Sequence, residues 1–254
     1  MASRIDFQHV EISFSGRPVV HDVSVSLQPG GESGSGKSTL IKAAMGLLGG
    51  TGLVTKGDIW FEGKNIPDLK EKELQQIRGA KIGMIFQDCG ASLSPIRTIG
   101  EQIVESMAAH KKVDREQARA EAMELFEKLR FQDGMRVWNS YPFELSGGMN
   151  QRAGIAIAML MNPSVLLADE PTSALDVAVQ RQVVEELKRV RDTFGTSIIL
   201  VTHDIGVVSA IADNILVLQN GYVREYGKAQ DVLNNPQNAY TQKLLSAVPR
   251  LRRA

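Results

Sequence analysis

Apolar residues recur in two different patterns along this chain, and these patterns predict where its strands and helices lie. In residues 5–14 and 23–27 apolar and polar positions alternate, which is typical of half-buried strands. Residues 81–87, 165–169 and 197–201 are instead short, nearly continuous apolar runs, which favour strands buried on both faces. We therefore expect an antiparallel part near the N-terminus and a buried, mainly parallel sheet further along the chain.

Residues 88–160 have a helical pattern. Residues 99–110 are predicted to form one helix, and Asp114 with Gln117 has the residue types and spacing of a capping box that opens a second one. The apolar positions that follow recur at helical spacing up to Leu129. This segment is predicted to be a helical lobe inserted into the chain.

Strands alternating with helices return after residue 160. Apolar residues from Val179 to Phe194 form a helical stripe that ends at Gly195, and Asn220-Gly221 joins two apolar runs, as in a hairpin. Together these patterns predict an α/β fold with a mainly parallel sheet, N-terminal antiparallel strands and a helical lobe. The predicted parts are a core in two pieces (1–87 and 161–228), the helical lobe (88–160) and a C-terminal extension (229–254).

Composition narrows the class of protein only slightly. The chain has 254 residues, a formal net charge of zero and one cysteine, Cys89. Because the net charge is zero, we expect no positive electrostatic field that recruits nucleic acid. Because there is a single cysteine, we expect no intramolecular disulfide and a reducing cytosol as the compartment. No apolar run is long enough to cross a bilayer and the first residues have no signal-peptide core, so any work at a membrane is expected to go through partner subunits.

Residues 31–38 fit the phosphate-binding pattern G-x-x-x-x-G-K-[ST]. Glycines allow successive backbone amides to converge on one anion, and a helix predicted from residue 38 adds its positive N-terminal end. Lys37 supplies a charge for the β- and γ-phosphates, and the Ser38 hydroxyl can ligate Mg²⁺. The candidate nucleotide-binding residues of this loop are Gly31, Ser33, Gly34, Ser35, Gly36, Lys37, Ser38 and Thr39.

The phosphate-binding pattern departs from expectation at its start. Such a loop should follow a buried strand, but here residues 23–27 run through Gln28-Pro29-Gly30 directly into Gly31. A strand of about five or six residues is missing, so either the chain is shortened here or the sequence omits a segment. If the chain is shortened, residues 23–27 could move into the vacant position in the sheet. Loss of the strand would otherwise impair folding or nucleotide binding.

Two further segments contain candidate catalytic or ligand-binding residues. Asp169 and Glu170 end an apolar strand, where an acid can hold Mg²⁺ and a second acid can polarise water. Residues 145–148 read Leu-Ser-Gly-Gly before an apolar helix, which is a second helix start suited to an anion. Phe14 precedes a turn and could either stack on an adenine ring or pack in the core.

These segments, in this order, resemble the ATPase subunit of ABC transporters over nearly the whole chain. The matching features are the loop at 31–38, Gln87 after a strand, the signature segment at 145–148, the Asp169-Glu170 pair, residues 173–176 and His203. The resemblance implies that ATP and Mg²⁺ are bound. Phe14 would stack on adenine, Lys37 and the loop amides would hold phosphates, and Ser38 and Gln87 would ligate Mg²⁺ with support from Asp169.

The resemblance also implies catalytic roles and a dimer. Glu170 would act on the attacking water, His203 would contact the γ-phosphate, and Asp176 would lie at the dimer seam. Ser146, Gly147 and Gly148 would cap the ATP held by the opposite subunit. Implied partners are a second ATPase chain, homologous or identical, two permease subunits and an extracytoplasmic solute-binding protein, with the chain peripheral on the cytoplasmic face of the inner membrane.

Finer details are similar to the branch that serves peptide and nickel importers. They include Phe86-Gln87-Asp88, Tyr141-Pro142-Phe143-Glu144 and Asn235-Pro236. Many peptide-type members carry a cysteine-containing tail that is not seen here, which favours the shorter nickel-type subunits. Two alternatives stay open: a soluble ABC ATPase acting on nucleic acid or ribosomes, which the neutral charge disfavours, and a hydrolysis-impaired, nucleotide-gated subunit, which the missing strand favours.

Overall fold

A computed structural model describes residues 4–27, 33–34, 37–87, 89–173 and 175–247. The chain divides into two compact units, each made from segments that are distant in sequence. One unit comprises residues 3–69 and 199–254, and the other comprises residues 1–2 and 70–198. The four-part division by function that the sequence suggests stays a prediction.

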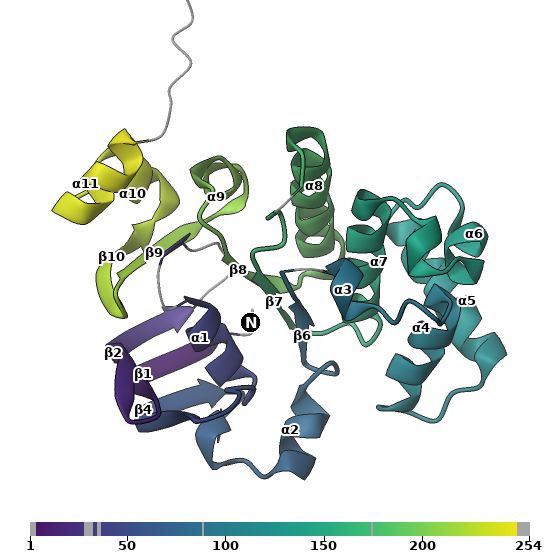
Figure 1. Cartoon of the computed structure of the whole chain (residues 1–254), viewed down its shortest axis with the longest axis horizontal. Coiled ribbons are helices and arrows are strands. Elements are labelled where there is room, and N and C mark those ends of the chain that lie inside the picture. The colour runs from purple at the N-terminus through teal and green to yellow at the C-terminus, as the bar shows by residue number, and fades with distance from the viewer. Residues whose placement is uncertain (1–3, 28–32, 35–36, 88, 174, 248–254) are drawn as a thin grey trace, which may run out of the picture. The chain divides into compact units, whose positions relative to one another are not determined.

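The first unit, residues 3–69 and 199–254, contains an antiparallel sheet in the order β2-β1-β4-β5 (Figure 1). Its strands are β1 (Ile5–Phe14), β2 (Arg17–Leu27), β4 (Gly52–Phe61) and β5 (Lys64–Asn65). The apolar residues Ile5, Phe7 and Ile12 of β1 are buried, and the alternation of buried and less buried positions shifts where the register is irregular after Phe7. A short 3₁₀ helix, η1 (Ile66–Asp68), follows β5.

A second sheet in this unit has the order β10-β9-β3. The strands β9 (Asn214–Gln219) and β10 (Tyr222–Lys228) form the predicted hairpin, and Asn220 and Gly221 both have positive φ at its turn. The strand β3 (Ser33–Gly34) runs parallel to β9. The helices of the unit are α1 (Lys37–Ala44), α9 (Ile205–Ile211), α10 (Ala229–Asn234) and α11 (Ala239–Ser246).

The second unit, residues 70–198, holds the buried strands and the predicted helical lobe. Strands β6 (Ile82–Ile85) and β7 (Val165–Asp169) pair in parallel, and β8 (Ser197–Val201), which continues past residue 198, completes the order β6-β7-β8. Every residue of β7 and β8 is buried, which explains their continuous apolar sequence.

The helices of this unit are α2 (Glu71–Ile77), α3 (Cys89–Ser92), α4 (Ile99–Ala108), α5 (Arg115–Lys128), α6 (Gly134–Asn139), η2 (Pro142–Glu144), α7 (Gly147–Met159) and α8 (Val177–Phe194). Asp114 accepts a hydrogen bond from the N–H of Gln117, so the capping box predicted at the start of α5 is confirmed. Gly195 ends α8 with a φ of 67°, a left-handed conformation that glycine adopts without a steric cost. The α/β fold with a mainly parallel sheet, antiparallel N-terminal strands and a helical lobe is confirmed.

Candidate functional site: a nucleotide-binding loop, a signature helix and an acidic strand end

Two residues of the phosphate-binding loop, Ser33 and Gly34, form the short strand β3. Ser33 pairs with Val217 and Gly34 with Leu218, so the two residues extend the sheet beside β9. Residues 23–27 stay in the antiparallel sheet, where Leu27 pairs with Ile5. The expectation that residues 23–27 would move into the vacant position is therefore wrong. These residues pair with β1 along one side of β2, and their apolar side chains are buried there.

Lys37 is the first residue of α1 and is almost completely buried, with 4% of its surface exposed. Its Nζ donates a hydrogen bond of 2.5 Å to the carbonyl oxygen of Thr202. Ser38 and Thr39 follow in the first turn and are half-buried. The other predicted loop residues, Gly31, Ser35 and Gly36, lie outside the described residues.

The bond from Lys37 brings the loop helix next to His203, another predicted site residue. His203 follows Thr202 directly after β8, and its side chain is exposed. The next residue, Asp204, caps α9 by accepting hydrogen bonds from the N–H groups of Gly206 and Val207. Within this unit the fold therefore places the loop lysine beside the strand end that carries the histidine.

Phe14 ends β1 opposite Gly52 of β4. Its ring lies directly over that glycine: a Cβ at residue 52 would be only 2.6 Å from Cε1 of Phe14. The ring is half-buried, so one part of it packs against the sheet and another part is accessible. Core packing therefore accounts for part of this side chain, and its stacking on a base stays a prediction.

In the second unit, Asp169 ends β7 and is buried, with 6% of its surface exposed. Glu170 follows with a φ of 50°, in the left-handed region that residues with a side chain seldom adopt. The carbonyl of Glu170 accepts hydrogen bonds from both the N–H and the Oγ of Ser173, at 3.0 and 2.9 Å. The acidic strand end is thus a tight turn rather than a flexible loop.

The signature segment opens α7. Ser146 is the N-cap residue of this helix, and its Oγ accepts a hydrogen bond of 3.3 Å from the N–H of Met149. Gly147 is exposed, and a Cβ there would meet no atom within 4 Å. Gly148 faces Val179 of α8. Ser146 and Gly147 therefore present an open helix start.

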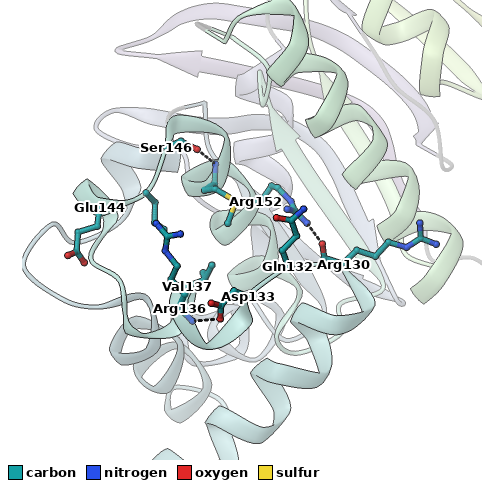
Figure 2. A pocket seen from close by; sticks show the side chains of 10 residues that line it. Arg130, Gln132, Asp133, Arg136, Val137, Glu144, Ser146 and Arg152 are labelled. Atoms are coloured by element: carbon teal, nitrogen blue, oxygen red, sulfur yellow. Dashed lines mark hydrogen bonds between the residues drawn. The ribbon is translucent and has the colours of Figure 1, made fainter.

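Two pockets flank the signature segment. One, of about 410 Å³, lies beside Ser146 and is shown in Figure 2; its wall includes Arg130, Arg136 and Arg152. The other, of about 380 Å³, is lined by residues from three predicted site segments, namely Gln87, Gly90, Gly147, Asn150, Gln151, Ser173 and Leu175. The exposed Gln87, which follows β6, is thus brought near the signature helix and the loop after β7.

Asp176 is the N-cap residue of α8. Its Oδ1 accepts hydrogen bonds from the N–H groups of Ala178 and Val179, at 2.9 and 3.0 Å. The next residue, Val177, is exposed to 82%. The carboxylate of Asp176 therefore fixes the start of α8, while the apolar side chain beside it faces outward.

A buried charge cluster connects the signature helix to α8, and sequence reasoning missed it. Glu186 is 2% exposed, and its Oε2 binds Arg152 of α7 at 3.2 Å and Arg189 of α8 at 2.8 Å. Burial raises the pKa of Glu186, and the two arginines only partly oppose this shift. The signal in the sequence was an acid at position 186 on the apolar face formed by Val183, Leu187 and Val190.

The donor types suit Mg²⁺, which prefers oxygen ligands. The predicted ligands are a hydroxyl of Ser38, a side-chain amide of Gln87 and a carboxylate of Asp169. Ser38 belongs to one unit, and Gln87 and Asp169 belong to the other. Among the residues that the structure describes, no group of three histidine, cysteine or acidic side chains could hold a metal ion.

Comparisons with known proteins identify the family of this chain. The family model described as ABC transporter matches residues 20–173, and the model of the oligopeptide/dipeptide transporter C-terminal region matches residues 224–254. The chain is 43% identical over 238 residues to an oligopeptide transport ATP-binding protein of Haemophilus influenzae, covering 91% of this chain and 73% of the relative. It is 40% identical over 262 residues to a dipeptide transport ATP-binding protein of Bacillus subtilis, covering 99% and 78%.

A solved structure is also similar. It is the dimeric post-hydrolysis state of the ATP-binding cassette MJ0796 bound to ADP and Pi, with a TM-score of 0.75 and 28% identity, covering 89% of this chain and 98% of that one. The chain belongs to the ABC transporter family, as an ATPase subunit. The predicted family is thus confirmed, and its peptide branch agrees with the relatives, whereas none of those named here is a nickel transporter.

No helix in the described part of the chain combines the length and apolar character that a bilayer span requires.

Proposed function

We propose that this chain hydrolyses ATP to power the import of peptides through a membrane transporter. The observation that carries the proposal is the presence of two helix starts suited to phosphate groups in one chain. One is the start of α1 at Lys37, and the other is the open, Ser146-capped start of α7. Each ATP would be bound by the phosphate-binding loop of one chain and covered by the signature segment of a second chain. Two chains packed head to tail would therefore use both helix starts.

The proposed roles follow the resemblance residue by residue. Lys37 would hold the phosphates, and Ser38 and Gln87 would ligate Mg²⁺ with support from Asp169, since these side chains supply suitable donors. Bound Mg²⁺ would neutralise charge on the phosphates. Phe14 would offer the accessible part of its ring to adenine.

The proposed catalytic groups come from both units. Glu170 would accept a proton from the attacking water, and the exposed His203 would contact the γ-phosphate. Asp176 would lie at the seam between the two chains, where the exposed Val177 adds an apolar surface. Ser146, Gly147 and Gly148 would close over the nucleotide of the partner chain.

The proposed partners are a second ATPase chain, identical or homologous, two permease subunits and an extracytoplasmic solute-binding protein. The chain would work at the cytoplasmic face of the inner membrane, held there by the permeases. Peptides are preferred over nickel as the solute because the similar relatives are named for oligopeptide and dipeptide transport. The formal net charge of zero gives no support for the alternative of nucleic-acid or ribosome binding.

A specific observation favours a second candidate, a nucleotide-gated subunit with impaired hydrolysis. Ser33 and Gly34, which the resemblance assigns to the phosphate loop, are paired with β9 in the sheet. The alignment with the Bacillus subtilis relative extends over 262 residues although this chain has 254, so that relative has positions without a counterpart here.

An ATPase assay on the purified chain, alone and with its co-purified permease pair, separates these functions. Hydrolysis that the permeases accelerate supports the proposed importer subunit. Nucleotide binding without hydrolysis in both samples supports the gated subunit. Hydrolysis that responds to RNA or ribosomes and not to the permeases would contradict the proposal.

A further inference from the structure

The turn after Asp169 is held by side chains from three different places in the chain. In residues 170–172, three successive backbone carbonyls each accept a hydrogen bond from a side chain. These bonds are Ser173 Oγ to Glu170 O at 2.9 Å, Gln151 Nε2 to Pro171 O at 2.8 Å, and Gln180 Nε2 to Thr172 O at 3.2 Å. Three successive bonds of this kind fix the path of the backbone that carries Glu170.

The conformation of Glu170 needs such support. Its φ of 50° lies in the left-handed region, where a residue with a Cβ is unfavourable by about 1–3 kcal/mol unless its surroundings hold it there. The next residue is a proline, which has no backbone N–H. The carbonyl of Pro171 is therefore the only backbone hydrogen-bonding group through which that residue can be held.

Gln151 supplies the partner of this carbonyl. It lies on α7, five residues after the N-cap Ser146, and only 5% of its surface is exposed. Its hydrogen bond to Pro171 is buried and joins residues 20 positions apart. The signature helix thus reaches the residue that follows the proposed catalytic carboxylate.

We propose that Gln151 is a positioning residue for Glu170. Its side-chain amide holds the carbonyl of Pro171, the residue directly after Glu170, and so fixes the end of the left-handed turn. The Glu170 carboxylate is thereby directed to one place before nucleotide arrives. Gln151 itself touches neither nucleotide nor water in this role. The inference depends on the proposed function, in which Glu170 acts on the attacking water.

Small displacements of a proton acceptor have large effects on rate. A misplacement of about 1 Å can lower a rate by about a hundredfold, because the reacting atoms no longer meet in a productive geometry. Gln151→Met keeps the length of the side chain and removes the amide. We expect it to lower kcat for ATP hydrolysis by about tenfold to a hundredfold, with an unchanged KM for ATP and unchanged affinity for a fluorescent ATP analogue.

A matched control comes from the C-terminal part of the chain. Gln242 Nε2 also donates to a proline carbonyl, that of Pro236, at 2.9 Å. Gln242→Met removes the same kind of bond far from Glu170 in sequence and should leave kcat and KM unchanged. If Gln151→Met does not fold, Gln151→Asn keeps an amide one methylene too short to reach Pro171 and should give the same selective loss of kcat.

The decisive measurement is ATP hydrolysis by the double variant that carries both Gln151→Met and Glu170→Gln. If Gln151 acts through Glu170, the double variant has the same residual hydrolysis as Glu170→Gln alone. The role of Gln151 would be overturned if the reductions in kcat from the two substitutions multiply in the double variant. It would also be overturned if folded Gln151→Met and Gln151→Asn both have wild-type kinetics. Either result would leave the proposed function standing. Wild-type hydrolysis by Glu170→Gln alone would overturn the proposed function, and the inference about Gln151 with it.

Discussion

The Nζ of Lys37 donates a 2.5 Å hydrogen bond to the carbonyl oxygen of Thr202, the residue before His203. The lysine of the phosphate-binding pattern is thus tied to the strand end that carries the proposed γ-phosphate contact. This arrangement keeps a buried ammonium group hydrogen-bonded, which is essential because burial of an unpaired charge is costly.

Lys37→Ala is expected to weaken ATP binding by at least about tenfold, because the phosphates lose a charge-assisted contact worth about 1.5–3 kcal/mol. Titration with a fluorescent ATP analogue measures the change. Lys42→Ala, on the same helix, is the control and should bind nucleotide as the wild type does. Unchanged affinity in Lys37→Ala would contradict the assignment of the loop.

Glu170→Gln is expected to lower the rate of ATP hydrolysis by about 10²–10⁴-fold, because an amide cannot accept the proton of the attacking water. The variant should still bind ATP and should accumulate as a nucleotide-bound dimer, seen by size-exclusion chromatography with light scattering. Glu185→Gln changes an exposed acid of α8 in the same way and serves as the control. Wild-type turnover by Glu170→Gln would refute the role of this carboxylate.

Insertion of about five apolar, strand-forming residues between Gly30 and Gly31 is expected to stabilise the protein and tighten ATP binding. The new strand would pair beside β9 and release Ser33 and Gly34 to the loop. Each side chain it buries contributes about 1.5–3 kcal/mol to the free energy of unfolding.

Denaturant unfolding and ATP titration measure both effects of this insertion. An insertion of equal length made of glycine and serine is the control, since it lengthens the chain without adding a buried strand. Equal stability and affinity for the two insertions would show that the sheet lacks no strand at this position.

Glu186 gives the stability of the protein a predictable pH dependence. Burial raises its pKa above the ordinary value of 4.5, so the folded state binds the proton more tightly than the unfolded state. Its stabilising contribution is therefore complete below pH 4.5 and is lost as pH rises through the raised pKa. Glu186→Gln keeps an oxygen for Arg152 and Arg189 and does not titrate.

The free energy of unfolding of Glu186→Gln, relative to the wild type, should therefore increase as pH rises from acid towards neutral values. Urea unfolding at a series of pH values measures this difference. Two curves that stay parallel over the whole range would show that Glu186 does not titrate differently in the folded and unfolded states.

Periodic patterns predicted the elements well because local physical rules determine them. Residues 165–168 are a continuous apolar run that ends at Asp169, and β7 has the predicted bounds 165–169 and is buried at every position. The end of α8 follows from Gly195, whose left-handed conformation a helix terminus requires. Ser146 was recognisable as a helix start because serine is a favoured N-cap residue.

The contacts that hold the site could not be predicted in the same way. The bond from Gln151 to Pro171 joins two elements through one amide, and no periodicity in the sequence marks it. Ser33 and Gly34 pair with β9, although the sequence pattern predicts a phosphate-binding loop at these residues. Such contacts depend on the tertiary structure, which overrides local preference.

If each ATP lies between the loop of one chain and the signature segment of another, two chains with different damaged segments should complement each other. Lys37→Ala damages the phosphate-binding loop, and Ser146→Arg blocks the signature segment at the exposed start of α7. Each variant alone should hydrolyse ATP poorly, because every site in its dimers is damaged.

A mixed dimer of the two variants contains one site with an intact loop and an intact signature segment. The measurement is ATP hydrolysis by an equimolar mixture of Lys37→Ala and Ser146→Arg chains, compared with each variant alone. The mixture should recover a substantial fraction of the wild-type rate. A mixture no more active than its two components would show that the loop and the signature segment do not act on the same ATP from two chains.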